Sequence, residues 1–178
     1  MTPLVPIGIV TCSDRASAGI YRDEGGPAIE AYIGRVLVSP WTPHRVLIPD
    51  DRETIGRTLS GLVDDVGCAL VFTTGGTGPS PRDVTPEATA DICDRLLPGF
   101  GEAMRLASLA EVPTAILSRQ IAGLRRAALI VNLPGRPAAI ATCLNAVFSA
   151  IPYCIELAGG PSIATDPTQC RAFRPGGG

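Results

Sequence analysis

The sequence contains no lysine, so all fifteen of its basic residues are arginines, and it contains a single histidine, His44. The absence of lysine excludes Schiff-base catalysis and the phosphate-binding loop that depends on a lysine. A single histidine and the absence of a G-x-S-x-G motif also disfavour a serine-histidine hydrolase. Because His44 stands between a proline and an arginine ahead of an expected strand, we expect it to be exposed or satisfied by local contacts.

Aromatic residues account for only 4% of the 178 residues and charged residues for 18%, whereas hydrophobic residues account for 46%. A chain this apolar should fold, and its length fits one domain. Seventeen acidic residues against fifteen basic ones leave a net charge of −2, which gives no broad positive surface. We therefore expect no nucleic-acid partner.

The six cysteines include no C-x-x-C pair, which argues against a zinc site because zinc ligands cluster more tightly. We expect them to be free, buried thiols in a reducing compartment. The first ten residues lack the basic start and long apolar stretch of a secretory leader, so we expect a cytoplasmic protein. These cysteines are Cys12, Cys68, Cys93, Cys143, Cys154 and Cys170.

The stretch 137–155 carries no charge and approaches the length of a membrane span, about 20 residues. Thr142, Asn145 and Pro152 within it argue against contact with lipid. We expect this stretch to be buried in the core or against another subunit, and we expect no membrane partner.

Apolar runs of strand length alternate with helical patterns along the chain, which predicts an α/β fold around a mainly parallel sheet. We expect strands at 7–12, 46–48, 69–74, 114–117 and 127–132. We expect helices from about residue 26, from about residue 55, over 86–96 and 102–110, and after Pro137. Residues 1–160 should form one domain, and residues 161–178 should form an extended, partly mobile tail rich in glycine and proline.

The segment 73–86 (TTGGTGPSPRDVTP) leaves an expected buried strand and enters a helix. In open α/β sheets, ligands bind beyond the carboxyl ends of the strands. Gly75, Gly76 and Gly78 let the backbone approach a ligand, and Thr77 adds a hydroxyl donor, which suits an anionic group. The loop is neither a lysine-containing phosphate loop nor G-x-G-x-x-G, so it does not indicate NAD or flavin. The alternative is a tight turn whose glycines serve only its geometry.

Two carboxylates are further candidates: Asp50 follows the expected strand 46–48, and Asp83 lies between the glycines of the loop and the helix that follows. If this strand and the strand before the loop are neighbours, both side chains emerge at one edge of the sheet and could hold Mg²⁺ against a phosphate. Asp14, after the first strand, would lie at the same edge. The alternatives are that Asp50 caps a helix, because Glu53 follows three residues later, and that Asp14 is a simple turn residue.

Further polar residues stand at the ends of other apolar runs. Ser118 follows the run 114–117, and Asn132, Pro134 and Gly135 follow the run 129–131, although such residues are also ordinary in turns. Arg82 is the best candidate for a cation facing a phosphate, against the alternative of a solvated loop residue. Weaker candidates are Arg15, Arg119 and Arg136.

A series of motifs runs in order along most of residues 7–158. They are 13–19 (SDRASAG), 48–50 (IPD), 74–78 (TGGTG), 81–89 (PRDVTPEAT), 98–100 (PGF), 113–119 (PTAILSR), 132–135 (NLPG) and 151–155 (IPYCI). With these motifs the chain resembles the molybdopterin adenylyltransferases of molybdenum cofactor biosynthesis, the bacterial Mog-type proteins related to the G domains of gephyrin. Some family members carry an insertion where residues 148–150 here run directly into Ile151.

The resemblance implies an enzyme that transfers AMP from Mg-ATP to the terminal phosphate of molybdopterin and releases pyrophosphate. It implies that Asp50 and Asp83 are catalytic and hold Mg²⁺. It also implies that the glycine loop cradles phosphate and that the positions of Asp14, Ser118 and Asn132 surround the bound pterin or nucleotide. The implied fold is a three-layer αβα sandwich that assembles as a homotrimer, and a downstream molybdenum-insertion protein would accept the product.

Two other functions remain open at this point. One is a non-catalytic homologue that binds molybdopterin or serves as a scaffold, because a fold alone does not determine activity. The other is a hydrolase or phosphatase that uses the same carboxylates and metal. The presence of both Asp50 and Asp83 favours catalysis, since simple binding would not require them.

Overall fold

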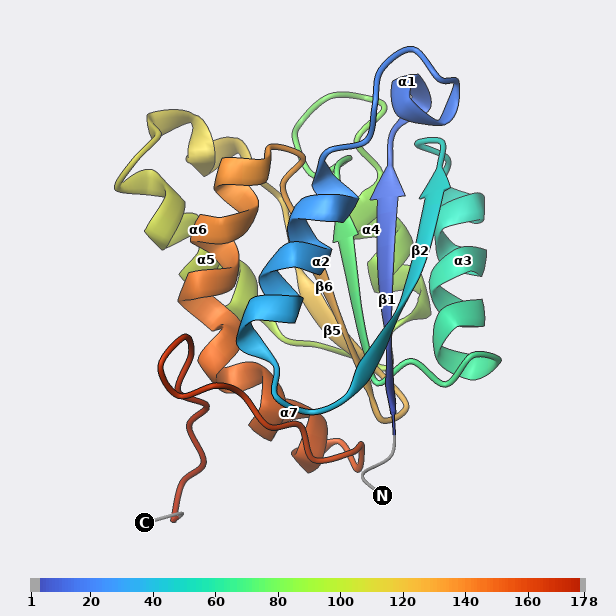
Figure 1. Ribbon diagram of the computed structural model, residues 1–178. Coiled ribbons are helices and arrows are strands. Elements are labelled where there is room, and N and C mark those ends of the chain that lie inside the picture. Colours follow the sequence, from blue (N-terminus) through green and yellow to red (C-terminus); the bar gives the residue numbers. More distant parts are fainter. Residues whose placement is uncertain (1–3, 177–178) are drawn as a thin grey trace.

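Six strands form one sheet in the order β2-β1-β3-β6-β5-β4 in the computed structural model, which describes residues 4–176 (Figure 1). Strands β1, β2, β3 and β6 are parallel to one another, β5 is antiparallel to β6, and β4 is antiparallel to β5. The prediction of a mainly parallel sheet is therefore confirmed. The bounds are β1 (Val5–Cys12), β2 (Trp41–Ile48), β3 (Leu70–Thr74), β4 (Arg95–Leu96), β5 (Ala122–Arg125) and β6 (Ala128–Leu133).

Helices cover both faces of the sheet, which confirms the three-layer architecture (Figure 1). One face packs against α2 (Gly25–Val36), α5 (Pro98–Leu109), α6 (Pro137–Val147) and α7 (Ile151–Leu157). The other face packs against α3 (Arg52–Asp64) and α4 (Thr85–Ile92). The remaining helical elements are short: α1 (Asp14–Ser17) and the 3-10 turns η1 (Pro113–Leu117) and η2 (Phe148–Ala150).

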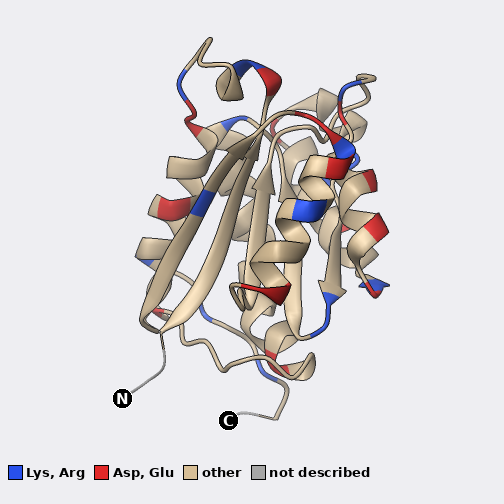
Figure 2. Cartoon of the chain, turned by 90° about the vertical axis from the view of Figure 1, so that its right-hand side faces the viewer, with Lys and Arg blue, Asp and Glu red and all other residues tan. Residues whose placement is uncertain are grey.

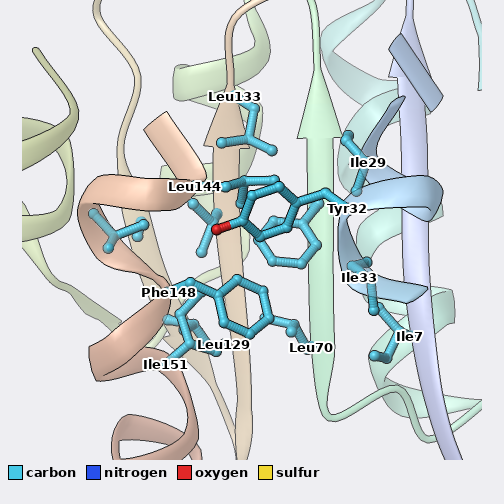
Figure 3. Packing of buried hydrophobic residues seen from close by; sticks show 14 of the residues in the cluster. Ile7, Ile29, Tyr32, Ile33, Leu70, Leu129, Leu133, Leu144, Phe148 and Ile151 are labelled. Atoms are coloured by element: carbon cyan, nitrogen blue, oxygen red, sulfur yellow. The ribbon is translucent and has the colours of Figure 1, made fainter. Parts of the chain in front are cut away.

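The central strands β1, β3 and β6 contribute to two separate cores because successive side chains point to opposite faces of a sheet. In β1, Ile7 and Ile9 enter the core beneath α2 and α6, and Val10 and Cys12 enter the core beneath α3. Figure 3 shows the first core, where side chains from α2, α6 and the strands meet. Full burial of one such aliphatic side chain contributes about 1.5–3 kcal/mol. Coverage of both faces explains why these strands are continuous apolar runs in the sequence.

The order of the strands reverses at β1, because β2 lies on one side of it and β3 on the other. In open α/β sheets, such a reversal leaves a crevice at the carboxyl ends of the two diverging strands, and ligands bind there. In this chain the crevice lies between the ends of β1 and β3. The glycine loop begins at the end of β3, so it borders this crevice.

Several local predictions were wrong. Residues 114–117 form the 3-10 turn η1 instead of a strand, because the segment lies on the surface, where Ile116 is 69% exposed and has no sheet to pair with. The helix expected over 86–96 ends at Ile92, and Arg95–Leu96 then form β4. Strand β5 was missed because Gly123 and Arg125 interrupt its apolar pattern. His44 lies within β2, which begins five residues earlier than expected at Trp41.

The uncharged stretch forms α6, η2 and α7. Within the described chain, Pro137–Leu157 is the one segment long and apolar enough to cross a membrane by length and composition, and 44% of its most apolar window is buried. Leu144, Phe148 and Ile151 face the core beneath the sheet (Figure 3), and Ile140 belongs to the same core, so packing accounts for this part of its apolar character.

The segment after α7 is held against the domain by its own contacts. Ile163 is buried in the core, the backbone N–H of Asp166 donates to the carbonyl of Val36 at 2.8 Å, and Arg174 pairs with Glu156. The expected domain 1–160 and tail 161–178 include residues 1–3 and 177–178, which lie outside the described residues. The domain boundary and the mobility of the tail stay predictions.

Candidate active site

Asp14 and Asp50 connect the ends of β1 and β2 through two reciprocal hydrogen bonds. The backbone N–H of Asp14 donates to Asp50 Oδ2 at 2.9 Å, and the backbone N–H of Asp50 donates to Asp14 Oδ1 at 3.0 Å. The register of the two strands, which pairs Cys12 with Ile48, places the two turns opposite each other. Each carboxylate therefore fixes the backbone of the other, and Asp50 does not cap α3, a position taken by Asp51.

The second carboxylate oxygen of Asp50, Oδ1, is buried and has no hydrogen-bond partner among residues 4–176. Burial raises the pKa of Asp50, and the charges of Asp14 and Asp83 raise it further, against the opposing effects of the Asp14 N–H and Arg82. An ionised oxygen that is buried without a partner is costly unless a cation or donor satisfies it. The geometry of Asp50 therefore suits a bound cation.

The glycine loop lies directly beside this oxygen. Gly75 and Gly76 have φ angles of +94° and +64°, which L-residues rarely adopt. A Cβ atom on Gly76 would lie 3.1 Å from Asp50 Oδ1, and one on Gly75 would lie 2.3 Å from the carbonyl oxygen of Cys12. The hydroxyl of Thr85 donates to the carbonyl of Gly75 at 3.0 Å. A Cβ atom on Gly76 would also lie 2.3 Å from Thr85 Oγ1, so only glycine lets the backbone approach the carboxylate this closely.

Asp83 closes the other end of the loop. Its Oδ2 accepts from the backbone N–H of Ser80 at 2.9 Å, and its own N–H donates to the Ser80 carbonyl at 2.9 Å. A Cβ atom on Gly78 would lie 2.9 Å from Asp83 Oδ2. Asp50 borders the same loop at Gly76, so both predicted carboxylates lie beside the glycine loop.

Arg82 lies at the same edge and is paired with Asp14. Its Nε donates to Asp14 Oδ2 at 2.9 Å and its Nη2 donates to Asp14 Oδ1 at 2.8 Å, which lowers the pKa of Asp14. The side chain of Arg82 is 65% exposed. Exposed ion pairs are weak, so an incoming phosphate can compete with Asp14 for this guanidinium. Figure 2 shows charged residues in the loops above the strand ends as well as along the helices.

Two of the other predicted residues, Pro134 and Gly135, border the loop. Thr74 Oγ1 donates to the carbonyl of Pro134 at 2.8 Å, and a Cβ atom on Gly135 would lie 3.7 Å from the Cα of Gly75. Gly135 is exposed. This turn therefore forms a wall of the crevice.

The side chains of Asn132 and Ser118 are hydrogen-bonded within the protein. Asn132 is fully buried, and its Nδ2 donates to the hydroxyls of Thr73 and Thr89 at 3.0 and 2.9 Å, so it supports the loop from below. Ser118 Oγ donates to Gln120 Oε1 at 2.9 Å. Both side chains are bonded to the protein, but Asn132 Oδ1 is buried without a hydrogen-bond partner among residues 4–176. Direct contact of either side chain with a ligand stays a prediction.

The expectation that Arg119 could face a phosphate is not met by its geometry, because its guanidinium bonds inward to the loop and to Glu87. Arg15 lies over the ring of Tyr21, 5.2 Å from its centroid, and the Tyr21 hydroxyl bonds Ser13 Oγ at 2.8 Å. Glu87 and Tyr21 were not predicted as site residues. The position of Glu87 one turn into the helix after the glycine loop was the available signal.

The donors present fit Mg²⁺. The described residues contain no group of three or more His, Cys, Asp or Glu side chains placed to hold a metal. Mg²⁺ is commonly bound by one or two carboxylates together with substrate phosphates and water, so two carboxylates suffice. The unpartnered oxygen of Asp50 is the observation that supports such a site.

Two grooves of the described chain are lined by other residues. A groove of about 780 Å³ runs between α3 and α4, and an apolar one of about 370 Å³ runs between α5 and the end of α6. Neither is lined by Asp14, Asp50 or Asp83.

The six cysteines are free. Burial raises the pKa of Cys12, the cysteine nearest the crevice, to about 12, so its thiol is not a nucleophile.

Replacement of Asp50 by asparagine should raise the melting temperature of the ligand-free protein at neutral pH. Because the pKa of Asp50 is raised on folding, its contribution to stability is present at low pH and is lost as the pH rises through that pKa. The asparagine oxygen still accepts from the Asp14 N–H. Thermal unfolding at neutral pH and at lower pH, toward the ordinary pKa of an aspartate, checks this. The difference in melting temperature between Asp50→Asn and the wild type should become smaller on acidification. A difference that widens would contradict it.

The fold defines the class: an α/β domain with a mainly parallel sheet whose strand order reverses at β1. A family model described as "Probable molybdopterin binding domain" matches residues 8–153, and the chain belongs to this family. The chain is 51% identical to the molybdopterin adenylyltransferase of Haemophilus influenzae over 187 residues, which cover 98% of this chain and 95% of that protein.

Two further relatives agree. The chain is 50% identical to the molybdopterin adenylyltransferase of Escherichia coli K12 over 181 residues, which cover 95% of this chain and 93% of that protein. The structure of the molybdopterin biosynthesis enzyme MoaB from Thermus thermophilus superimposes with a TM-score of 0.80 at 38% identity, covering 89% of this chain and 99% of that one. The predicted family is confirmed.

Proposed function

We propose that this protein is a molybdopterin adenylyltransferase, which transfers AMP from ATP to the terminal phosphate of molybdopterin. The observation that carries the proposal is the unpartnered, buried oxygen of Asp50, which lies against the glycine loop and within the electrostatic reach of Asp83. The names of the near full-length relatives support the same activity.

The reaction balances without a general base. An oxygen of the molybdopterin phosphate attacks the α-phosphorus of ATP, a new P–O bond forms, and the bond to the β-phosphate breaks so that pyrophosphate leaves. A phosphate monoester has a second pKa near 6, so the attacking oxygen is already largely ionised at neutral pH. The lack of need for a general base fits this chain, which has no lysine and whose single histidine, His44, lies in the middle of β2.

The residues present supply charge and position. Asp50 and Asp83 would hold Mg²⁺, which neutralises charge between the two anionic reactants. The loop 75–78 presents backbone N–H groups to phosphate, and the exposed Arg82 can leave Asp14 for a phosphate oxygen. The turn at Pro134 and Gly135 forms the wall of the crevice. Alignment and electrostatic stabilisation are the main requirements of phosphoryl transfer.

The assembly and the location complete the proposal. The structure exposes apolar side chains on α5 and beyond it, namely Leu106, Leu109, Val112, Ile116 and Leu117, which a second copy of the chain would cover. A cytoplasmic homotrimer that passes its product to a molybdenum-insertion protein fits this surface and the free thiols. Light scattering of the purified protein tests the number of subunits.

The decisive experiment is incubation of the purified protein with molybdopterin, ATP and Mg²⁺, followed by mass analysis of the products. We expect adenylylated molybdopterin and pyrophosphate in equal amounts, and no product when Mg²⁺ is removed by a chelator. Free AMP or inorganic phosphate would instead indicate a hydrolase. Binding of molybdopterin without any product would indicate the non-catalytic scaffold.

A further inference from the structure

Arg119 bonds to three carbonyl groups of the segment 77–83, one through its backbone and two through its side chain. Its backbone N–H donates to the carbonyl of Thr77 at 2.8 Å. Its Nε donates to the carbonyl of Gly78 at 2.8 Å and its Nη2 donates to the carbonyl of Asp83 at 2.6 Å. Its Nη1 is paired with the carboxylate of Glu87 in α4.

These contacts join three separate parts of the chain. Arg119 follows η1, Thr77 and Gly78 belong to the loop after β3, and Glu87 belongs to the first turn of α4. The Arg119 side chain is 38% exposed, and hydrogen bonds from a charged donor are stronger than neutral ones. A planar guanidinium directs its donors in a fixed fork, so it can bond both carbonyls and the carboxylate at once.

We propose that Arg119, oriented by Glu87, is a positioning residue that holds the loop between Thr77 and Asp83 in the geometry needed for AMP transfer. Arg119 does not touch the reactants, because its donors are directed into the protein. It acts through the Asp83 backbone and through the carbonyls of the loop. The inference rests on the proposed function, since its kinetic test requires AMP transfer by the wild-type protein.

The test compares Arg119→Ala with the wild-type chain. A misplacement of about 1 Å in a catalytic group costs up to about 100-fold, so we expect kcat to fall roughly 10- to 100-fold. The KM for ATP should change less than kcat. Added guanidinium ion should restore part of the rate in Arg119→Ala, and Arg119→Lys should stay impaired because an ammonium cannot bond both carbonyls and Glu87.

Two further measurements separate positioning from simple loss of stability. Hydrogen exchange at the amides of Ser80, Asp83 and Thr85 should become faster in Arg119→Ala while the strand amides keep their protection. Arg125→Ala is the matched control, because Arg125 likewise pairs with a carboxylate, Asp64, and donates to a backbone carbonyl, that of Ile92 at 2.9 Å, away from the loop. It should lose stability and keep kcat.

The experiments distinguish failure of the positioning role of Arg119 from failure of the proposed function. Wild-type kcat in Arg119→Ala, or a loss of kcat matched by Arg125→Ala and not restored by guanidinium, would overturn the positioning role. If the wild-type protein transfers no AMP, the proposed function fails, and unchanged exchange of the loop amides in Arg119→Ala would then overturn the positioning role independently.

Discussion

Replacement of Asp83 by asparagine should lower the rate of AMP transfer by about 1,000-fold while molybdopterin still binds. Asparagine keeps the size of the side chain and an oxygen that can accept from the Ser80 N–H, so the turn at the end of the loop should persist. The negative charge opposite Asp50 is lost, and with it one of the two carboxylates proposed to hold Mg²⁺. Asp83→Ala should lose the transfer as well, together with the bond to Ser80.

The measurement is the initial rate with molybdopterin and Mg-ATP, together with the affinity for molybdopterin by calorimetry. Asp51→Asn is the matched control, because Asp51 is adjacent to Asp50 but caps α3 by accepting from the Thr54 N–H at 2.8 Å. Asparagine caps a helix as well as aspartate does, so Asp51→Asn should keep its rate. Unchanged turnover in Asp83→Asn would eliminate the proposed mechanism.

The gathering of the candidate site residues at one edge of the sheet could be predicted from the sequence because it follows from where strands end. The apolar runs before Asp14, Asp50 and Gly75 are buried strands, and parallel neighbouring strands bring their carboxyl ends to the same edge of the sheet. The convergence of the polar residues needed only this topology. The reciprocal bonding of Asp14 and Asp50 depends on the register of β1 against β2, which the apolar pattern does not specify.

The features that were not predicted depend on contacts between distant segments. The sequence indicates Arg119 only as a weaker candidate for a cation facing a phosphate, and only the tertiary structure places its Nε 2.8 Å from the carbonyl oxygen of Gly78. Asn132 follows an apolar run like a turn residue, but β6 continues through it and its side chain is buried against Thr73 and Thr89. Short strands such as β4 are formed by pairing with a neighbour, and local propensity gives little sign of them.

Replacement of Gly75 by alanine should destabilise the protein by about 3–5 kcal/mol, through backbone strain and a steric clash together. The φ angle of +94° is unfavourable for any L-residue, and the new Cβ would lie 2.3 Å from the carbonyl oxygen of Cys12. Cys12 is paired with Ile48 in β2, so its backbone cannot move away without loss of the strand end. For a domain of this size, the melting temperature should fall by roughly 10 °C or more.

Gly67→Ala separates the clash from the strain. Gly67 also has a positive φ, +80°, but a Cβ atom there would meet nothing within 4 Å, so only the strain remains. That strain is worth about 1–2 kcal/mol. Thermal and denaturant unfolding of the two variants should therefore differ by about 2–3 kcal/mol, the part that arises from crowding. Equal stabilities of Gly75→Ala and Gly67→Ala would mean that the loop does not approach β1 this closely. The described geometry of the crevice beside Asp50 would then be wrong.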